Sequence, residues 1–440
     1  MKLSGWGRFP VADCAVSSAR DQTDVTSALA DGALIARGNG RAYGDSALNR
    51  EQTLAMRGMG RMLVFDASAG VLVAEAGVLL EEVIATFLPR GWFPAVTPGT
   101  KLVTLGGMIA ADVHGKNHHG EGSMRNCVDW LDLAGADGTV RRCSRSENAE
   151  LFEWTLGGMG LTGVILRAAI RLRAVESAWI RQTTIPADNL AAAMAAFEAS
   201  QGATYSVAWI DCLAKGKALG RSLVMLGEHA KLADLPPAKQ AAPFAGKRRP
   251  KLAVPIDFPA FALNGLTVRL FNQLYYAAGK AKGRHAVVDW DSYFYPLDAI
   301  RDWNRIYGKP GFAQFQCALP LERSEAGLTA LLEAISRAGL GSFLAVLKRF
   351  GEGGGGMSFP MPGYTLALDF PVSERTRALF ETLDRIVIAH GGRQYLAKDS
   401  RMSAATLSAS DNRVEAFRAY RDASGAKPRF RSLQSERLGL

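Results

Sequence analysis

Two glycine-rich segments in the first third of the chain constrain its fold more than any other feature. The longer one is Thr97–Ser123, TPGTKLVTLGGMIAADVHGKNHHGEGS. Glycine lets a backbone approach a ligand closely because it has no Cβ atom, and successive backbone N–H groups in such turns bind phosphate oxygens. The segment holds three histidines (His114, His118 and His119), but zinc would need further ligands, and the chain has no Cys-x-x-Cys pair. The sequence therefore favours a ligand-binding turn over a metal site or a surface cluster.

The shorter segment, Ala36–Asp45 (ARGNGRAYGD), follows the apolar run Ala33–Ala36, which predicts a strand. A dinucleotide fingerprint would need Gly-x-Gly-x-x-Gly at the start of a helix and an acidic residue about 20 residues later. The residues after Gly40 are mostly turn formers, which argues against that fingerprint. A plain hairpin loop remains an alternative for this segment alone, but the two glycine segments together favour a cofactor cradle.

Composition limits the compartment and the partners. The 440 residues are enough for two or three domains. No apolar run is long enough for a transmembrane helix, and the N-terminal residues lack the apolar core of a signal peptide. The net charge is +10, but the basic residues are dispersed without a recognition motif, so nucleic-acid binding is not expected. Reduced, buried thiols in a cytoplasmic protein are predicted for five scattered cysteines: Cys14, Cys127, Cys143, Cys212 and Cys317.

A mobile basic loop is predicted at about residues 230–284. Its first part is rich in Pro, Ala and Lys and contains the basic core Lys247–Lys251. Apolar and aromatic residues follow from Leu252 to Tyr276. Basic residues beside exposed apolar ones suit an anionic membrane surface, and a merely solvated linker is the alternative.

Strand-like and helix-like patterns alternate along the chain and predict an α+β fold. The expected strands are residues 168–175, 205–211, 311–319 and 342–348. The expected helices are residues 186–200, 328–338 and 375–390, the first of them capped by Asp188. Gly351–Gly356 predicts a loop. Periodicity alone allows either a parallel or an antiparallel sheet.

Several motifs carry a resemblance to a known family. They are GRAYGD, TPGT, GGMIAADVHGKNHHGEGS, YSVAWID, WNRIYG, FLAVLKRFG and GGRQYLAKDSR. The paired glycine segments resemble the FAD-binding fold of the vanillyl-alcohol oxidase superfamily, and the full set resembles the decaprenylphosphoryl-β-D-ribose 2′-oxidases. The resemblance implies an α+β, two-domain flavoprotein. Its FAD-binding domain would be residues 1–175, its substrate domain, with an antiparallel sheet and flanking helices, residues 176–392, and residues 393–440 would return to the FAD-binding domain.

The same resemblance implies an activity and partners. The substrate would be a polyprenyl-phosphoryl-β-D-ribose, a lipid-linked sugar phosphate whose 2′-hydroxyl is oxidised to a ketone. A separate nicotinamide-dependent keto-reductase would complete the epimerisation to the arabinose donor for cell-envelope polysaccharide. The lipid implies a cytoplasmic protein in peripheral contact with the membrane. Two alternatives stay open: an FAD-dependent dehydrogenase of a soluble sugar, alditol or hydroxy acid, and a flavin-free binding module at the membrane.

Flavin-dependent alcohol oxidation needs a group that takes or shares the hydroxyl proton, and positive charge that stabilises the reduced flavin. A partly desolvated lysine can serve either role. The resemblance places the catalytic lysine at Lys398, with Tyr43 and His114 beside flavin and substrate. Without the resemblance, a salt bridge of Lys398 with Asp399 or another acid would be the favoured interpretation.

The resemblance also implies two sets of binding residues. Flavin contacts are expected from Arg37, Gly38, Asn39, Gly40, Arg41, Ala42, Tyr43, Gly99, Thr100, Val103, Thr104, Gly106, Gly107, Ala111, Val113, His114, Asn117, Gly163, Val164 and Tyr395. Substrate contacts are expected from Lys116, Trp209, Gln314, Gln316, Lys348, Ala367 and Lys398. Gln-x-Gln on a strand places both amides on one face, whereas a core position is the alternative for Trp209.

Two positions depart from the family pattern. Many superfamily members attach FAD covalently through a histidine in the first glycine segment. This chain has Arg41 and Ala42 there, so we expect non-covalent FAD. The mycobacterial enzymes have a pocket cysteine before an Asp-Phe-Pro turn, where this chain has Ala367 and therefore no thiol.

Overall fold

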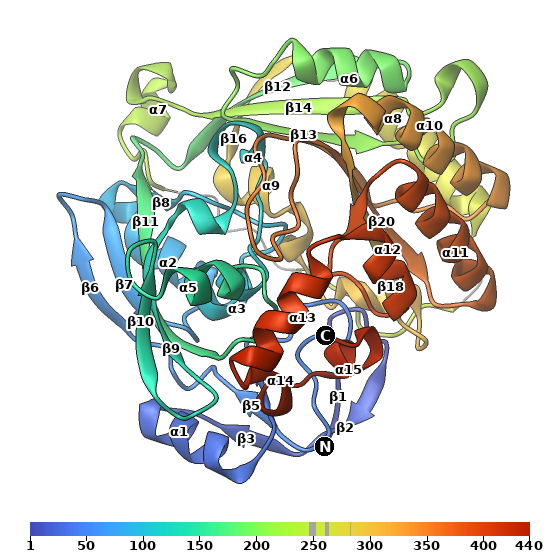
Figure 1. Cartoon of the computed structure of the whole chain (residues 1–440). Coiled ribbons are helices and arrows are strands. Elements are labelled where there is room, and N and C mark those ends of the chain that lie inside the picture. The colour runs from blue at the N-terminus through green and yellow to red at the C-terminus, as the bar shows by residue number, and fades with distance from the viewer. Residues whose placement is uncertain (246–251, 260–263, 282) are drawn as a thin grey trace.

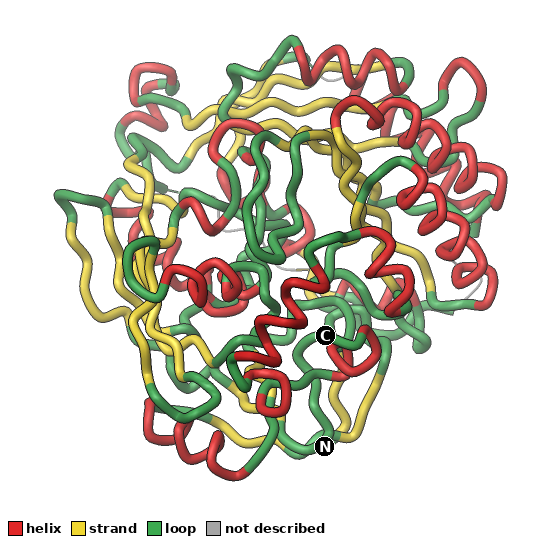
Figure 2. The backbone as a smooth tube through the Cα atoms, viewed as in Figure 1, coloured by secondary structure: helices red, strands yellow, loops and turns green. Residues whose placement is uncertain are grey.

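Two large antiparallel sheets, of six and eight strands, organise the chain (Figure 1). The computed structural model describes residues 1–245, 252–259, 264–281 and 283–440. The six-stranded sheet comes from the N-terminal part of the sequence and the eight-stranded sheet from the middle. Figure 2 shows long loops converging between the two sheets.

The six-stranded sheet has the order β10-β9-β11-β7-β6, and β8 also pairs with β11. Its strands are β6 (Met62–Asp66), β7 (Val71–Glu75), β8 (Trp92–Pro94), β9 (Val128–Ala134), β10 (Val140–Ser144) and β11 (Val164–Ala174). The helices of this part are α1 (Gln22–Asp31), α2 (Leu80–Phe87), α3 (Leu105–Ala110), α4 (His118–Glu121) and α5 (Ala149–Thr155). One core joins the sheet to its helices because Leu72 and Leu131 of the sheet pack with Ile109 of α3, all fully buried.

The C-terminal segment lies against the start of the chain. A small parallel sheet holds β3 (Val16–Ser18), β5 (Thr53–Ala55) and β4 (Ile35–Arg37), next to a hairpin of β1 (Lys2–Ser4) and β2 (Val11–Asp13). The amide of Leu34 donates to the carbonyl of Arg429 (2.8 Å), and the amide of Arg431 donates to the carbonyl of Leu34 (3.0 Å). The C-terminal helices are α12 (Ala404–Ser410), α13 (Val414–Ala423), α14 (Ala426–Arg429) and α15 (Leu433–Leu438).

The eight-stranded sheet has the order β16-β12-β14-β13-β19-β20-β18-β21. Its strands are β12 (Trp179–Ala187), β13 (Tyr205–Ile210), β14 (Ser222–His229), β16 (His285–Asp289), β18 (Phe312–Pro320), β19 (Ala345–Phe350), β20 (Gly363–Pro371) and β21 (Arg393–Gln394). Every pairing in it is antiparallel, which confirms the predicted sheet type.

One face of this sheet is an apolar core and the other is polar. Phe315, Leu347 and Leu366 point into the core beneath α6 (Leu190–Glu198), α10 (Leu321–Ala338) and α11 (Glu374–Ala389). Figure 1 shows α10 and α11 on the side of β18 and β20 that faces away from the six-stranded sheet. Since side chains alternate along a strand, the intervening residues point to the opposite face.

Sequence patterns predicted most of these elements and failed at particular positions. The predicted helix at 328–338 begins earlier, at Leu321, because Pro320 supplies the extended residue that precedes a first turn. The cap assigned to Asp188 is wrong. Asn189 caps α6 by accepting a hydrogen bond from the amide of Ala192 (2.9 Å), while Asp188 accepts one from Tyr276. All five cysteines are free and buried, as predicted.

The predicted loop at 230–284 is only partly a loop. It contains the short helix α7 (Pro237–Gln240) and the long helix α8 (Gly265–Ala281). Helix α8 buries Val268, Asn272 and Tyr276, spaced four residues apart, and this regular face was hidden in the sequence by many apolar neighbours. The basic core Lys247–Lys251 lies outside the described residues. The segment continues with β15 (Leu252–Ala253), later paired with β17 (Ile300–Arg301), and leads through β16 to α9 (Trp290–Phe294).

An aromatic cluster joins the two sheets around His229 at the end of β14. Its ring lies against Phe93 (5.1 Å between centroids), Tyr205 (5.7 Å) and Phe294 (6.2 Å). Within the described residues neither ring nitrogen has a hydrogen bond of normal geometry. Burial, followed by the positive charge of Arg173, lowers the pKa of His229 to about 3. The folded protein therefore keeps this imidazole neutral.

A neutral, buried His229 predicts acid sensitivity. Below about pH 6.5 the His229 imidazole binds a proton in the unfolded chain but stays neutral in the folded chain. The contribution of His229 to the free energy of unfolding is therefore complete above that pH. It is then lost by about 1.4 kcal/mol per pH unit towards pH 3. We expect His229→Phe, which keeps the ring packing, to lose about 1 kcal/mol less unfolding free energy than wild type between pH 7.5 and 5.5. Urea unfolding at both pH values measures this difference. His285→Phe, at an exposed position of β16, is the control. If wild type and His229→Phe lost the same unfolding free energy between the two pH values, His229 would not be the source of the acid sensitivity.

Candidate active site

The structure brings the two glycine segments into direct contact. The side-chain amide of Asn39 donates to the carbonyl of Leu102 (2.8 Å). A Cβ atom at Gly38 would overlap the hydroxyl of Thr104, so the close approach depends on glycine at that position. The same hydroxyl accepts a hydrogen bond from the amide of Gly107 (3.3 Å) and caps α3. Thr104 therefore fixes the start of α3 and the spacing between the segments.

The two segments leave polar atoms that suit the FAD expected from the sequence. Arg41 Nε, Thr97 Oγ1, Asn117 Oδ1 and His114 Nδ1 are buried, and none has a hydrogen-bond partner within the described residues. A Cβ atom at Gly99 would meet no other atom within 4 Å, so open space adjoins this turn. Since buried polar groups are nearly always hydrogen-bonded, unsatisfied donors and acceptors beside glycine turns fit a bound dinucleotide.

The other expected flavin contacts surround these segments. Arg37 donates to the carbonyl of Ser4 (2.8 Å), and Thr100 donates to Asp298 (2.8 Å). Tyr395 donates to the carbonyl of Ala111 (2.8 Å) and joins the C-terminal region to α3. The remaining expected contacts lie on the glycine segments or at the start of β11: Gly40, Ala42, Val103, Gly106, Val113, Gly163 and Val164. Their flavin contacts stay predictions.

Five expected substrate residues lie on the polar face of the eight-stranded sheet. In β18, Gln314 and Gln316 alternate with core residues, as the Gln-x-Gln pattern predicted. Gln316 is paired with Ala367 of β20, which is paired in turn with Val346 of β19. The register continues through Lys348, opposite Thr365, and through Trp209 of β13, opposite Val346. These side chains therefore form one contiguous patch, here called the pocket face.

His114 connects the second glycine segment to this pocket face. Gln316 Nε2 lies 3.1 Å from His114 Nε2, and because an amide nitrogen only donates, the imidazole proton resides on Nδ1. The ring packs against Phe350 (4.8 Å) and Tyr395 (5.3 Å). Burial, followed by the charge of Lys348, lowers the pKa of His114 well below its usual value. His114 is therefore a neutral imidazole whose Nδ1–H is free to donate to a ligand.

Lys398 and Tyr43 meet beside the first glycine segment. Lys398 Nζ lies 3.6 Å from the centroid of the Tyr43 ring, whose edge packs against Phe312 (5.3 Å). The Tyr43 amide donates to the carbonyl of Ala397 (3.0 Å), which holds the two motifs together. Burial lowers the pKa of Lys398, and the negative charge of Asp369 opposes that effect. Burial, followed by the same charge, raises the pKa of Tyr43 well above its usual value.

The alternative salt bridge between Lys398 and Asp399 does not form. Asp399 is buried and pairs with Arg437 (2.9 Å), which also pairs with Asp45 of the first glycine segment (2.8 Å). The clamp of Arg437 on these two carboxylates ties the lysine motif to the first glycine segment and leaves the Lys398 ammonium available to the site.

Asp369 was not predicted as a site residue. The Asp-Phe-Pro sequence was assigned to a turn, but β20 continues to Pro371, so this assignment is wrong. Asp369 is fully buried on the pocket face, two residues beyond Ala367, and accepts a hydrogen bond from the side chain of Gln314. The alternation of side chains along a strand would have placed Asp369 on the same face as Ala367, but the assignment to a turn hid this pattern.

Lys116 and the histidine cluster lie at the edge of the site, whereas Lys348 lies on the pocket face. The Lys116 ammonium donates to the carbonyl of Tyr293 and lies 4.2 Å from the centre of that ring. Burial lowers the pKa of Lys116 to about 7 and that of Lys348 to about 8. His118 and His119 bind backbone groups of other loops. In the part of the chain that the structure describes, no three His, Cys, Asp or Glu residues are grouped as a metal site requires.

Trp209 lies where the pocket face meets α8. Its indole nitrogen donates to the carbonyl of Phe343 (3.2 Å), and its ring packs against Tyr275 of α8 (4.8 Å between centroids). Trp209 is buried among Leu223, Tyr276 and Met225. Trp209 therefore lies on the pocket face and also packs in a small core, and its contact with a substrate stays a prediction.

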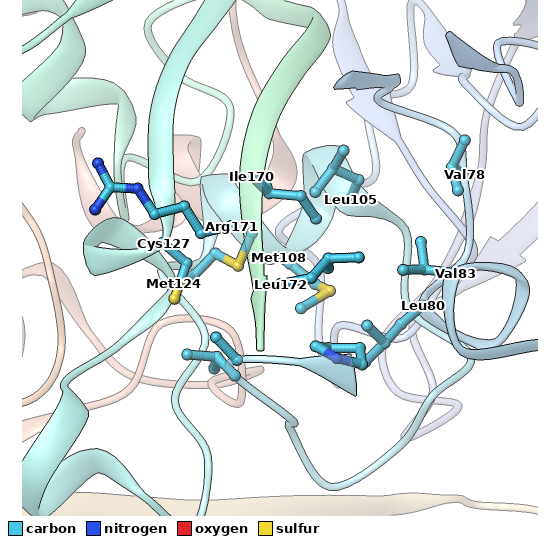
Figure 3. Close-up of a pocket in the computed structure, with 13 residues that line it drawn as sticks. Val78, Leu80, Val83, Leu105, Met108, Met124, Cys127, Ile170, Arg171 and Leu172 are labelled. Atoms are coloured by element: carbon cyan, nitrogen blue, oxygen red, sulfur yellow. The ribbon is translucent and has the colours of Figure 1, made fainter. Parts of the chain in front are cut away.

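A separate apolar recess lies between α3 and the six-stranded sheet (Figure 3). Its volume is about 10 Å³, roughly the space of one water molecule. The recess is lined mainly by apolar side chains: Val78, Leu80, Val83, Leu105, Met108, Met124, Ile170 and Leu172. It belongs to the packing behind the glycine segments and contributes no reactive group to the site.

Comparison with known proteins identifies the cofactor and the class. A family model described as an FAD binding domain matches residues 15–144. A decaprenylphosphoryl-β-D-ribose oxidase of Mycolicibacterium smegmatis is 36% identical over all of this chain and 97% of its own length. An uncharacterized protein of Streptomyces coelicolor is 33% identical over 82% of this chain and its own full length. An L-gulonolactone oxidase of Bos taurus is 31% identical over 34% of this chain and 33% of its own length. FAD is therefore the cofactor, and the protein is an oxidoreductase.

The contact between the first glycine segment and the lysine motif predicts that Gly44→Ala is damaging. Gly44 has an ordinary backbone conformation, but a Cβ atom there would overlap the carbonyl oxygen of Asp399. We expect a loss of about 1–3 kcal/mol in stability and weaker FAD retention, measured by thermal unfolding and by the absorbance ratio at flavin and protein wavelengths. Gly202→Ala, where open space surrounds the new methyl group, is the matched control. A Gly44→Ala protein with wild-type stability and FAD content would show that the overlap is relieved without cost.

Proposed function

The chain belongs to the decaprenylphosphoryl-β-D-ribose oxidase family, and on this premise we propose that it oxidises the 2′-hydroxyl of a polyprenyl-phosphoryl-β-D-ribose to the 2′-keto sugar. The observation that carries the proposal is the position of Lys398 and Tyr43. Tyr43 belongs to the first glycine segment, Lys398 lies against its ring, and a sheet face with two amides and a lysine adjoins them. This arrangement offers proton transfer, hydroxyl recognition and positive charge in one place.

Each side chain has a defined task in this proposal. When bound, FAD supplies the hydride acceptor. Lys398 Nζ takes the proton of the 2′-hydroxyl, and burial, which lowers its pKa, makes a neutral amine accessible near neutral pH. Tyr43 places its ring against that amine and limits the positions of the ammonium.

Recognition falls to the pocket face and the second glycine segment. The amides of Gln314 and Gln316 suit the hydroxyls of a pentose. Lys348 and Lys116 supply cations for the phosphate. Both lysines have lowered pKa values, so a bound phosphate would favour their charged forms. A soluble neutral sugar would leave them without an anion, which favours the lipid-phosphate substrate over the alternative class.

We further propose that FAD is held without a covalent bond. Arg41 and Ala42 occupy the part of the first glycine segment where a flavin-linking histidine is expected, and Arg41 lies over the ring of Trp6 (4.1 Å). The keto sugar would pass to a nicotinamide-dependent reductase, which is the class of enzyme that returns a ketone to an alcohol.

Helix α8 supports a peripheral membrane contact. Its outer face exposes an apolar stripe of Leu266, Leu270, Phe271, Leu274 and Tyr275, and Leu266 is 75% exposed. Its inner face is anchored, because Asn272 donates to Asp211 (2.7 Å) and Tyr276 donates to Asp188 (2.7 Å). Among the described residues no helix combines the length and apolar content needed to cross a bilayer.

The stripe also adjoins the site, and its helix carries a positive charge outside the stripe. Tyr275 contacts Trp209, which lies beside the pocket face. Arg269 is exposed on the same helix. Apolar and basic side chains on one helix suit the interface of an anionic bilayer, so we propose that α8 docks the protein where its lipid-linked substrate resides.

The main experiment follows the flavin absorbance under anaerobic conditions after addition of a prenyl-phosphoryl ribose. Bleaching by this substrate, with FAD released by acid precipitation, supports both the activity and the non-covalent cofactor. Bleaching only by free sugars would transfer the activity to the soluble-substrate class. A protein that keeps its flavin colour with every sugar tested would refute the proposed oxidation.

Lys398→Met should separate cofactor binding from turnover. We expect the variant to keep FAD, because methionine can keep the packing of this side chain on Tyr43. We expect it to reduce the flavin about 10²–10⁴-fold more slowly, because a general acid–base group has been removed. Stopped-flow absorbance measures the rate. Lys280→Met, on the exposed surface of α8, is the control. Wild-type reduction rates in Lys398→Met would remove this residue from the mechanism.

The membrane proposal predicts that acidic residues placed on α8 weaken binding to anionic vesicles. We expect Leu270→Glu/Leu274→Glu to lose about 10-fold or more in affinity for vesicles that contain phosphatidylserine, because two apolar contacts are lost and two repulsive charges are added. Vesicle co-sedimentation at low and high salt measures this. Leu63→Glu/Val64→Glu, at an exposed apolar pair on β6, is the matched control. Equal binding by both double variants would exclude α8 as the docking element.

A further inference from the structure

Asp112 is a fully buried carboxylate just after α3 that has no task in the proposed oxidation. It lies two residues before His114 in the second glycine segment, and its backbone has a left-handed conformation (φ 39°). This conformation is uncommon outside glycine, but aspartate and asparagine adopt it more readily than other residues. A carboxylate buried in such a turn needs specific hydrogen-bond donors, because an unsatisfied buried charge is costly.

Three hydrogen bonds satisfy the Asp112 carboxylate. The hydroxyl of Ser123 donates to Oδ2 (2.8 Å), and the backbone amide of Arg125 donates to Oδ1 (2.8 Å). The hydroxyl of Ser358, which is itself fully buried, also donates to Oδ2. Ser123 ends the second glycine segment, whereas Ser358 lies in the loop between β19 and β20 of the eight-stranded sheet. One side chain therefore joins the second glycine segment to that sheet.

Ser123 acts on the backbone of His114. The two residues form an isolated antiparallel bridge. Because Asp112 binds the Ser123 hydroxyl and also the amide of Arg125, it fixes the turn that lies opposite His114. The backbone that carries the imidazole is therefore held by a turn whose position depends on this carboxylate.

Ser358 acts on the ring of His114. It precedes Phe359, whose ring centroid lies 5.6 Å from that of His114 and 4.6 Å from that of Tyr395, on which it stacks. This aromatic wall packs against the imidazole, while Gln316 Nε2 lies 3.1 Å from His114 Nε2. Since the contact with Gln316 selects the His114 tautomer, a displaced wall would release the ring and change which nitrogen carries the proton.

We propose that Asp112 is a positioning residue that keeps the His114 imidazole in contact with Gln316 through Ser123 and Ser358. His114 belongs to the segment matched to an FAD binding domain and touches the pocket face, so its orientation couples the cofactor side of the site to the substrate side. Asp112 acts through the geometry of its hydrogen bonds rather than through its charge. The inference rests on the proposed function only for its kinetic readout, because the His114 tautomer can be observed without any substrate.

The direct test is ¹⁵N nuclear magnetic resonance of histidine-labelled holoenzyme, with the His114 signals assigned by their absence in His114→Gln. Wild type should show one tautomer, with the proton on Nδ1. In Ser358→Ala, both ring-nitrogen shifts should move towards the mean of the two tautomers, because the wall has lost its anchor. Ser324→Ala is the matched control, since it removes an equally buried hydroxyl that donates to the carbonyl of Leu319 (3.0 Å). Unchanged shifts in Ser358→Ala overturn the proposal.

Substitutions of Asp112 separate geometry from charge. Asp112→Asn keeps the side-chain length and suits the left-handed backbone. Its amide oxygen can accept from Arg125, and its amide nitrogen can donate to the two serine hydroxyls, which are also acceptors. Asp112→Asn should therefore keep the wild-type His114 shifts, whereas Asp112→Glu, with its longer side chain, should move them as Ser358→Ala does. Equal His114 shifts in the two variants would contradict a geometric role.

The kinetic test is the rate of flavin reduction by prenyl-phosphoryl ribose. We expect Ser358→Ala to be slower by about 10-fold or more, because misplacement of a group in the site is costly to the rate. Ser324→Ala should react at the wild-type rate. A slower Ser358→Ala whose His114 signals match those of wild type would assign Ser358 a structural role only and would refute the proposal.

Two further outcomes remain distinguishable. If Ser358→Ala does not fold, Ser123→Ala replaces it, because it removes the other hydroxyl from the same carboxylate oxygen. Unmoved His114 signals in that variant count against the proposal. If wild type is not reduced by the lipid-linked ribose, the proposed function fails, and the tautomer of His114 alone then decides the role of Asp112.

Discussion

Desolvation of charged side chains on one face of the eight-stranded sheet is the constraint on which the site depends. The opposite face must bury a continuous apolar core, so alternation along each strand sends every second residue to the pocket face. Asp369 is fully buried there and Lys348 and Lys398 are half-buried, and burial lowers the pKa of both lysines and raises that of Asp369. Such shifts are the condition under which proton transfer can be tuned.

Segments distant in sequence assemble this environment. The amides of Trp6 and Gly7 donate to the carbonyls of Ala42 and Tyr43, and the amide of Phe312 donates to Gly7. The start of the chain therefore joins the first glycine segment to β18, while Ala397 holds the same segment from the C-terminal side. The first glycine segment and the lysine motif fix each other in place, because a backbone hydrogen bond from Tyr43 to Ala397 joins them.

Sequence patterns predicted what depends on local periodicity. The antiparallel sheet, which also needed the family resemblance, and the shared face of Gln314 and Gln316 were correct. The pairing of the glycine segments was correct as well. The failures occurred where tertiary contacts override local signals. Asp369 was assigned to a turn through the family resemblance, although the proline that follows is compatible with the end of a strand. Helix α8 was missed because many apolar neighbours hide the regular spacing of its buried face, and the partners of that face, Asp188 and Asp211, come from distant segments.

The clamp of Arg437 on Asp45 and Asp399 has a consequence for synthesis on the ribosome. Domains generally begin to fold as they emerge, starting from the N-terminus. Here the first glycine segment is made early, the lysine motif much later, and the arginine that joins them after both. A nascent chain can therefore form both sheets before its reactive centre exists. The clamp therefore closes around sheets that are already formed, and the region around Lys398 is the last part of the fold to assemble.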